Sequence, residues 1–210
     1  VGSDQTVPED AGPQALSGWA TQISDGPRES GQTLSFAETG DTNPSLFSQE
    51  PALDPATGTL TFASAPNSSG TATITFVLHD DGGTAGGGSD TSAAQSFTIT
   101  VQPVNDAPSF LAGADQTTLE DSGAQSVVGW ATQMSPGPAD ESGQNLDFEV
   151  ENDTNPTLFS VAPAVDPATG TLTFTPSPNA FGSAVIDLAL HDDGGTANGG
   201  KDLSAPQNFT

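Results

Sequence analysis

Acidic and amide side chains are the residues of this sequence best suited to chemistry. The 210 residues include 27 Asp and Glu but only two Lys and Arg, so the formal net charge is -25. Two carboxylates about 4 Å apart repel by roughly 4 kcal/mol at an effective dielectric constant near 20, so several converge only around a cation. Calcium takes about six to eight oxygen ligands from carboxylates, amide carbonyls and backbone. A hard cation is therefore one explanation of the acidity, and a solvated acidic surface suited to a salty exterior is the other.

The composition also disfavours several functions. Nucleic-acid binding needs clustered Lys and Arg, and their shortage equally disfavours an anionic membrane surface. With no Cys in the sequence, neither disulfides nor a Cys nucleophile are available. We find no apolar run long enough for a membrane span and no basic leader after Val1. His79 and His191 alternate with Leu and should point outward. We predict no enzyme, although two-carboxylate glycosidase chemistry is compatible with the composition if a cleft exists.

The sequence consists of two copies of one unit. The segment GWATQ occurs at residues 18–22 and 129–133, DPATGTLTF at 54–62 and 166–174, and HDDGGTA at 79–85 and 191–197. The spacing between copies grows by one residue after the first segment. The added residue falls in a Gly/Pro-rich stretch, 26–32 against 137–144, which a surface loop tolerates.

Within each copy, apolar and polar residues alternate. Ile74, Phe76 and Leu78 are separated by single residues, as are Leu60 and Phe62. A period of two is typical of strands, and turn residues interrupt it every few positions. The strands expected in the first copy are residues 5–7, 14–22, 33–38, 46–49, 59–63, 71–79 and 95–102. We therefore predict an all-β chain of two tandem seven-stranded Greek-key β-sandwiches of immunoglobulin-like type.

Residues 104–108, VNDAP, separate the two copies. We assign residues 1–103 to the first repeat, 104–108 to a calcium-binding linker and 109–210 to the second repeat. Residues 207–210 match 95–98. We therefore expect the second repeat to be truncated within its last strand and the chain to be a fragment of a longer array.

The order of the loops predicts which acids meet. Successive loops of an antiparallel sandwich alternate between its two ends, so each copy brings one set of acidic and amide side chains to the linker. From the first copy these are Glu9, Asp10, Asp41, Asn43 and Asn67, and from the second Asp140, Glu141, Asp166, Asp192 and Asp193. Asn105 and Asp106 lie between the two sets. We predict that calcium (Ca2+) binds there and holds the repeats in line.

Three motifs resemble those of a known family. They are VPED at residues 7–10, HDDGG at 79–83 and VQPVNDAP at 101–108. With this spacing the chain is similar, over both copies, to the cadherin-like tandem repeats of large bacterial surface adhesins of the repeats-in-toxin type. The resemblance implies an extracellular stalk repeat of a bacterial cell-surface adhesin, made rigid by calcium and supporting cell adhesion or biofilm formation. It implies a monomer whose partners are calcium and neighbouring repeats, with no nucleic acid and no membrane insertion.

The resemblance also implies which residues hold the ion. In cadherins, calcium between domains is held by a Glu near the first strand, by the Asn-Asp linker and by acids in loops of the next domain. The matching residues here are Glu9, Asn105, Asp106, Glu141 and Asp192, and the full set of predicted ligands adds Asp140 and Asp193. Pro103 replaces the first linker acid, and residues 64–67 replace an acidic motif. Fewer ions or weaker binding are therefore expected.

Two of these features also have purely structural interpretations. The linker could be only an extended segment, because Pro108 keeps Ala107 out of helical backbone and Asx side chains bond their own backbone. The glycine-rich loops 81–90 and 193–202 could be solvated loops, although we interpret Asp80 and Asp192 as calcium anchors at their start.

The remaining motifs are expected to be structural. Asp54 and Asp166 open DPATG turns, in which Pro fixes one dihedral and Gly accepts a positive one. Trp19 and Trp130 are interpreted as core anchors of the second strand rather than platforms for sugars.

The alternative function is a carbohydrate- or protein-binding module within the same adhesin, which predicts an exposed aromatic patch.

Overall fold

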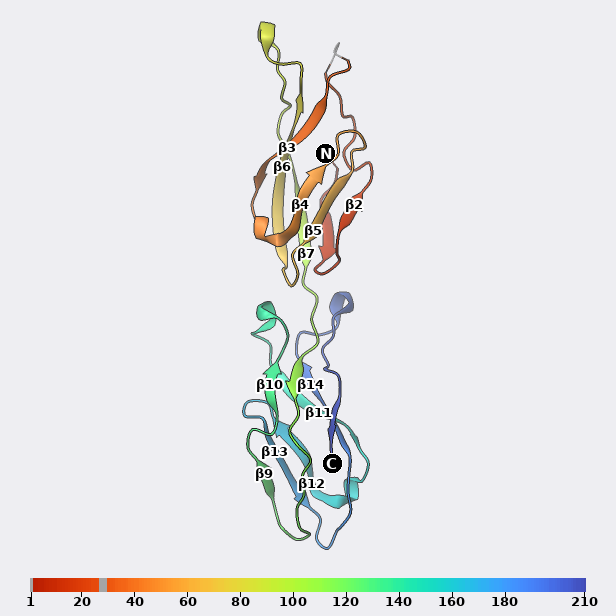
Figure 1. Ribbon diagram of the computed structural model, residues 1–210, viewed down its shortest axis with the longest axis vertical. Helices are drawn as coiled ribbons and strands as arrows, with labels where there is room; N and C mark the ends of the chain where they lie inside the picture. Colours follow the sequence, from red (N-terminus) through yellow and green to blue (C-terminus); the bar gives the residue numbers. More distant parts are fainter. Residues whose placement is uncertain (1, 27–29) are drawn as a thin grey trace. The chain divides into compact units, whose positions relative to one another are not determined.

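The computed structural model describes residues 2–26 and 30–210 as strands joined by turns and short 3-10 helices (Figure 1). The chain divides into two compact units, Val1–Val104 and Asn105–Thr210. Arg28 and the middle of the Gly/Pro-rich loop 26–32 lie outside the described residues. Within the described part, no helix is long and apolar enough to cross a membrane. The predicted all-β fold is confirmed.

Unit 1 is a sandwich of a four-stranded and a three-stranded sheet. Its strands are β1 (Gln5–Pro8), β2 (Gln14–Leu16), β3 (Leu34–Asp41), β4 (Phe47–Leu53), β5 (Leu60–Ser64), β6 (Gly70–Asp80) and β7 (Gln95–Gln102), with 3-10 helices η1 (Pro44–Leu46) and η2 (Ala85–Gly87). The sheet orders are β1-β7-β6-β3 and β2-β5-β4, and only the β1–β7 pair is parallel among the described residues. Pairing of β3 with β6 and of β1 with β7 gives the non-sequential order expected of a Greek key.

The core of unit 1 follows from the alternation of side chains along its strands. Ile74 in β6 is fully buried, and Phe97, Ile99 and Val101 of β7 are between 0% and 4% exposed. The residues between them carry hydroxyl side chains on the opposite face of the sheet. Burying each large apolar side chain contributes about 1.5–3 kcal/mol. β7 is therefore a central source of stability for this unit.

Unit 2 repeats this architecture with smaller sheets. Its strands are β8 (Ser109–Leu111), β9 (Gln125–Val127), β10 (Thr132–Ser135), β11 (Leu146–Asp153), β12 (Phe159–Asp166), β13 (Thr171–Pro176), β14 (Ile186–Asp192) and β15 (Gln207–Phe209), with 3-10 helices η3 (Ala139–Glu141), η4 (Pro156–Leu158) and η5 (Ala197–Gly199). The sheet orders are β11-β14-β15, β12-β13-β9 and β10-β8. Among its described residues, eight strands replace the seven predicted: six correspond to β2–β7, residues 116–119 at the place of β1 form no strand, and β8 and β10 pair with each other.

The predicted second strand, residues 14–22, is wrong beyond Leu16. β2 ends there, and a turn follows in which Gly18 has φ +64°. Gln22 has φ +57°. The positive φ of Gly18 interrupts the extended backbone directly after β2, so the chain leaves the sheet at this point. In unit 2 the chain turns likewise at Gly129 and then pairs elsewhere as β10.

Both tryptophans pack in a core, as predicted, but they lie after the second strand of their unit and not in it. Trp130 is 4% exposed and Trp19 packs against the core of unit 1. The Trp19 ring lies 4.3 Å from the Phe97 ring between centroids, and the Trp130 ring lies 4.7 Å from that of Phe209. Each indole NH donates to a backbone oxygen at 3.0 Å. These indoles are therefore not available as exposed platforms for sugars.

The DPATG segments are turns stabilised by their aspartates. Asp54 accepts hydrogen bonds from Ala56 N and Thr57 Oγ1, both at 2.8 Å, and Gly58 has φ +66°. These hydrogen bonds hold the pKa of Asp54 below its ordinary value. Asp166 makes the equivalent two bonds in unit 2. The structural interpretation of both aspartates is confirmed, and the oxygens of Asp166 are directed into its own turn.

Candidate metal site

Asn105 is the first residue of unit 2 and is fixed there by hydrogen bonds. Its Nδ2 donates to Asp192 Oδ1 at 2.8 Å and to the backbone oxygen of Lys201 at 2.7 Å. Its Oδ1 accepts a bond from Gln144 Nε2 at 2.7 Å, and its backbone oxygen accepts one from Lys201 N at 2.8 Å. Asp192 ends β14, and Lys201 closes the loop that follows it. Asn105 therefore joins the linker to two loops of unit 2.

Asp106 is held by Glu141 from a third segment. The backbone N of Asp106 donates to Glu141 Oε1 at 2.7 Å. Glu141 ends the short helix η3 and is 7% exposed. Burial raises the pKa of its carboxyl above the ordinary value, and the hydrogen bond from Asp106 opposes this rise. The negative charges of Asp106, Asp140 and Asp192 raise the pKa of Glu141 further.

Three oxygens of this cluster are buried and accept no hydrogen bond. They are Glu141 Oε2, Gln144 Oε1 and Asp192 Oδ2. Asp192 is completely buried, while its Oδ1 accepts bonds from Asn105 and from Gly194 N at 2.9 Å. A buried carboxylate oxygen without a donor or a counter-charge is costly. Among the described residues, His191 Nε2 lies 3.8 Å from Asp202 Oδ2, and this contact compensates none of these oxygens.

These residues fit a hard cation. Each of the three buried oxygens lacks a hydrogen-bond donor, and carboxylate and amide oxygens are the ligands that calcium takes. Glu141 and Asp192 would supply the two buried carboxylates, with Asp106 and the Gln144 amide oxygen beside them. The donor set contains no sulfur and no imidazole, which disfavours zinc and copper.

Two glycines allow the cluster to form. A Cβ atom placed on Gly137 would collide with Glu141 Oε2, and one placed on Gly194 would collide with Asn105 Oδ1 and Gln144 Nε2. Gly143, in the same loop as Gly137, has open space where its Cβ would lie. Gly137 and Gly194 are thus required for packing against the acids, and Gly143 is not.

The other two predicted ligands of unit 2 lie apart from the buried oxygens. Asp140 is exposed on η3. Asp193 is exposed and accepts bonds from Asn145 Nδ2 at 2.6 Å and Asn145 N at 2.8 Å. These bonds hold the pKa of Asp193 below its ordinary value. The structure therefore brings together Asn105, Asp106, Glu141 and Asp192, while the carboxylate of Asp193 closes its own loop.

In unit 1, Glu9 holds the end of the chain segment that leads to the linker. It is 4% exposed, and its Oε1 accepts a bond from Val104 N at 2.6 Å. Its own backbone N donates to Gln102 O at 2.8 Å. Asp10 Oδ1 accepts a bond from Asn67 N at 3.3 Å, as the loop order predicts. Glu9 is thus placed to fix Val104, and its role as a metal ligand stays a prediction.

Unit 1 has a loop equivalent to that of Asp192. Asp80 Oδ1 accepts a bond from Gly82 N at 2.9 Å, and Asp81 Oδ1 accepts one from Thr33 N at 2.9 Å. Gln32 Oε1 is buried and accepts no hydrogen bond, as for its counterpart Gln144. Gln32 and Gln144 occupy equivalent positions in the two copies of the sequence. This repetition could have identified Gln144, which the predicted ligands do not include.

A second acidic group was not predicted. Glu38 in β3, Asp41 at the end of β3 and Glu50 in β4 each have a carboxylate oxygen within 4.8 Å of the others. Burial, followed by the neighbouring acids, raises the pKa of Glu38 and of Glu50. Asp41 was expected beside the linker with Glu9 and Asn43. Its Oδ1 accepts a bond from Asn43 N at 2.7 Å, but its acidic neighbours are Glu38 and Glu50.

Comparison with known proteins gives only weak similarities. No protein-family model matches this chain, and no curated protein matches it significantly. Among solved structures, it is similar to human protocadherin-24 EC1-2 at 19% identity, covering 84% of this chain and 79% of that one, with a TM-score of 0.47.

Two further similar structures are also cadherin fragments. Drosophila N-cadherin EC1-4 is 13% identical, the match covers 100% of this chain and 48% of that one, and the TM-score is 0.48. The human desmocollin-1 ectodomain is 15% identical, the match covers 99% of this chain and 39% of that one, and the TM-score is 0.41. The chain thus spans less than half of these two fragments. Identities and TM-scores this low assign no family, and the β-sandwich fold rests on the strand pairing of the chain itself.

Proposed function

We propose that this chain is an adhesion-type extracellular repeat that binds calcium through Asp106, Glu141, Gln144 and Asp192, while Asn105 joins the linker to these residues. The observation that carries the proposal is the pair of buried carboxylates, Glu141 and Asp192, each with one oxygen that accepts no hydrogen bond. Their partners in the cluster are the two central linker residues. Calcium satisfies the buried oxygens and replaces mutual repulsion by attraction.

Calcium is preferred to magnesium because of the number of protein oxygens available. Magnesium keeps several waters and a nearly ideal octahedron, whereas calcium accepts an irregular set of carboxylate and carbonyl oxygens. The cluster offers Glu141, Asp192, Asp106 and the amide of Gln144 from three separate segments. Such a set suits the larger and less exacting ion.

The consequence for the linker is mechanical. Asp106 N already bonds to Glu141, and Asn105 bonds to Asp192. An ion held by the same two acids adds its binding free energy to these contacts and fastens residues 105 and 106 to unit 2. We propose that this stiffens the linker of a stalk repeat of a bacterial surface adhesin, with Glu9 holding Val104 on the side of unit 1.

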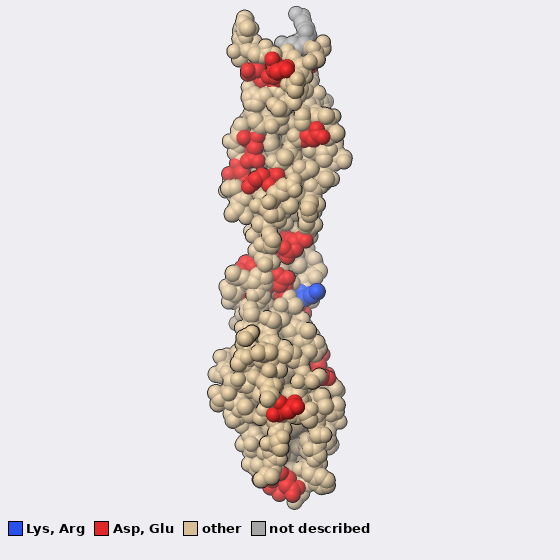
Figure 2. Space-filling view, viewed as in Figure 1, with Lys and Arg blue, Asp and Glu red and all other residues tan. Residues whose placement is uncertain are grey.

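The acidic surface supports an extracellular and salt-tolerant role. Acidic side chains occur at many places on the visible face of both units, and basic ones are nearly absent (Figure 2). High net charge of one sign keeps a protein soluble but opposes compaction. Bound cations relieve part of that opposition, so the proposed repeat is expected to depend on calcium for its full stability.

Thermal melting of the whole chain tests calcium binding. We expect the melting temperature to rise with calcium, since a ligand that binds only the folded state stabilises it by RT ln(1 + [L]/Kd). Millimolar magnesium should give a smaller rise at equal ionic strength. An unchanged melting temperature at millimolar calcium, together with no heat of mixing, would reject the proposal.

Small-angle scattering tests the stiffening separately. We expect the particle to become longer and less variable in length when calcium is added and to revert with chelator. Calcium binding without any change in scattering would retain the site and reject its mechanical role.

A further inference from the structure

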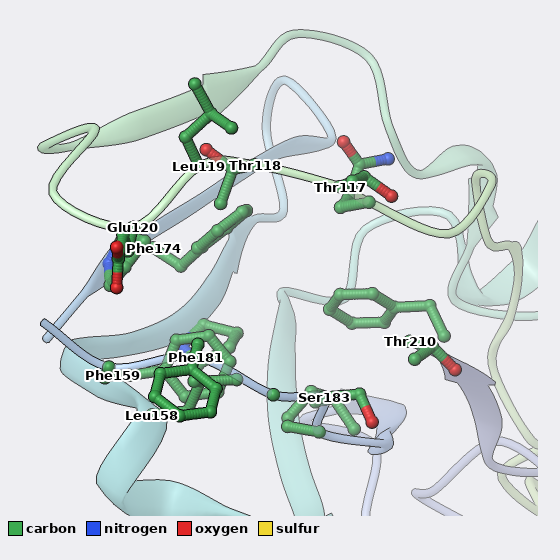
Figure 3. Close-up of a pocket in the computed structure, with 18 residues that line it drawn as sticks. Thr117, Thr118, Leu119, Glu120, Leu158, Phe159, Phe174, Phe181, Ser183 and Thr210 are labelled. Carbon is green, nitrogen blue, oxygen red and sulfur yellow. The ribbon is translucent and has the colours of Figure 1, made fainter.

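Unit 2 contains an apolar groove that plays no part in the calcium proposal. Its volume is about 370 Å³, and its walls include Leu158, Phe159, Phe174 and Ala184. Figure 3 shows residues 117–120 on one side, Leu158, Phe159, Phe181 and Ser183 on the other, and Thr210 at one end.

In unit 1 the corresponding space is filled by β7. Ile99 and Val101 of this strand are 0% and 1% exposed. β7 pairs in parallel with β1, where Gln5 lies opposite Ile99. On its other side β7 pairs antiparallel with β6, where Ala72 lies opposite Ile99 and Gly70 opposite Val101. One strand thus provides both the core residues and the hydrogen bonds that join β1 to β6.

The strand pairing of unit 2 stops where the groove begins. In the pairing of β15 with β14, Gln207 lies opposite Leu188 and Phe209 lies opposite Ile186. At the next residue, Thr210, the backbone oxygen accepts a hydrogen bond from Gln116 N at 2.8 Å. Residues 207–210 match residues 95–98, so Thr210 corresponds to Thr98, the residue before Ile99 in β7. The groove therefore continues the line of β15.

Both edges of the groove lack the regular structure of their counterparts. Residues 116–119 and 182–185 are not strands, whereas the equivalent residues of unit 1 belong to β1 and β6. A strand edge without a neighbour presents its NH and CO groups to an incoming chain. Two such edges on either side of one groove suit a single extended segment.

The apolar walls are less covered than in unit 1. Leu46 and Phe47 are 2% and 8% exposed, whereas their counterparts Leu158 and Phe159 are only partly buried. Leu119 and Phe181, at the rim, are 80% and 87% exposed. Contiguous exposed apolar surface of this kind marks a binding groove.

We propose that unit 2 binds one further extended strand in this groove, supplied by a peptide segment that carries β-branched apolar residues at alternate positions. The strand lies parallel to residues 116–119 and antiparallel to residues 182–185, in the register that β7 has between β1 and β6. Its apolar residues enter the groove and its polar residues face outward, as Ile99 and Val101 alternate with Thr100 in unit 1. This is recognition by strand addition, with backbone bonds providing affinity and the apolar positions providing specificity.

The register can be tested by crosslinking because the chain has no Cys of its own. The probe is a synthetic peptide with the sequence of residues 97–104 and Cys at the position of Thr100. Thr100 lies opposite Thr71 in unit 1, and the equivalent of Thr71 in unit 2 is Ser183. With dissolved oxygen as the oxidant, we expect the Ser183→Cys chain to form a disulfide with this peptide roughly tenfold faster than the matched Thr71→Cys chain, whose position already has a neighbour.

Equal rates for the two variants, or crosslinking of Ser183→Cys chains to each other in preference to the peptide, would overturn the proposal. In the second case the groove accepts another copy of the chain instead.

Calorimetry of the full chain in chelator tests the same groove without calcium. The peptide of residues 97–104 should bind one molecule per chain. In a control peptide, Ile99 and Thr100 swap places, and Val101 and Gln102 swap places. This peptide should bind roughly tenfold more weakly, because its polar side chains would face the groove. Leu119→Ala and Phe181→Ala, both exposed, should each weaken binding several-fold with the fold retained. Equal binding of the two peptides would overturn the proposal, whatever the result of the calcium titrations.

Discussion

The two acidic clusters of this protein differ in a way that separates a candidate metal site from a charged surface. Glu38, Asp41 and Glu50 have the more closely grouped oxygens, but Glu38 and Glu50 are exposed to water. One oxygen of Asp41 is buried and accepts no hydrogen bond, yet its neighbours can be hydrated or protonated. Close acids on a surface therefore need no ion.

In the cluster around Asn105, by contrast, two of the acids are buried. Glu141 and Asp192 are 7% and 0% exposed, and each has one oxygen that accepts no hydrogen bond. Burial makes the uncompensated charge costly and removes hydration as a remedy. The difference teaches that burial of unpaired oxygens, more than the spacing of acids, identifies the candidate site.

Asp192→Asn should have the largest effect. The new amide oxygen can still accept bonds from Asn105 and Gly194, so the calcium-free fold should persist. One ligand charge is lost, and we expect calcium affinity to fall about 100-fold, or about 2.7 kcal/mol, by calorimetry. Asp193→Asn is the matched control, since Asn145 already occupies its oxygens. An equal loss in both variants would show that the buried carboxylate has no special role.

Gly137→Ala should have the next largest effect. The added Cβ atom collides with Glu141 Oε2, and overpacking of this kind costs about 1–3 kcal/mol. We expect a lower free energy of unfolding in urea and weaker calcium binding. Gly143→Ala should leave both unchanged within about 0.5 kcal/mol, because its Cβ lies in open space. Equal destabilisation by the two substitutions would show that the close approach of Gly137 is not required.

Glu141 should make the stability of the calcium-free protein depend on pH. Burial is the main cause that raises the pKa of Glu141 in the folded state. At a pH between the ordinary pKa and this raised pKa, the folded protein therefore binds the proton of Glu141 more tightly than the unfolded protein does. Stability from this group is therefore present at low pH and is lost as pH rises through the folded pKa. Urea midpoints measured upward from pH 4.5 should decline less steeply in Glu141→Gln. A parallel decline in both proteins would contradict the assignment.

Glu50→Gln should have the smallest effect. It removes one charge from the exposed cluster, and surface substitutions usually change stability by no more than about 0.5 kcal/mol. Since the raised pKa of Glu50 arises from slight burial and from Asp41, any change should be stabilising at neutral pH. Calcium affinity measured by calorimetry should equal that of the unsubstituted chain. A loss of affinity comparable to that of Asp192→Asn would move the metal site to Glu38, Asp41 and Glu50.

The fold was largely predictable because its signals are local. Alternation in segments such as Ile74 to Leu78 identifies strands, and Asp54 with Gly58 identifies a turn from the residues of the turn itself. The end of β2 was missed because Gly18 lies within an apolar run, and its positive φ overrides the alternation.

The candidate site was only partly predictable because its geometry is not local. Loop order directs attention to Glu141 and Asp192, but it cannot tell that Asp192 is buried while Asp193 is exposed. Gln144 becomes a neighbour of Asn105 only through the fold. Glu38 and Glu50 meet across the edges of two sheets, and no spacing in the sequence encodes that contact.

Anomalous X-ray diffraction from crystals grown in calcium tests the central claim most directly. We predict a peak in the anomalous difference map about 2.3–2.6 Å from an oxygen of Glu141 and an oxygen of Asp192, the distance of calcium from its ligands. That peak should be absent in Asp192→Asn. Calcium bound only at Glu38, Asp41 and Glu50, or no peak near Glu141 in crystals saturated with calcium, would contradict the account.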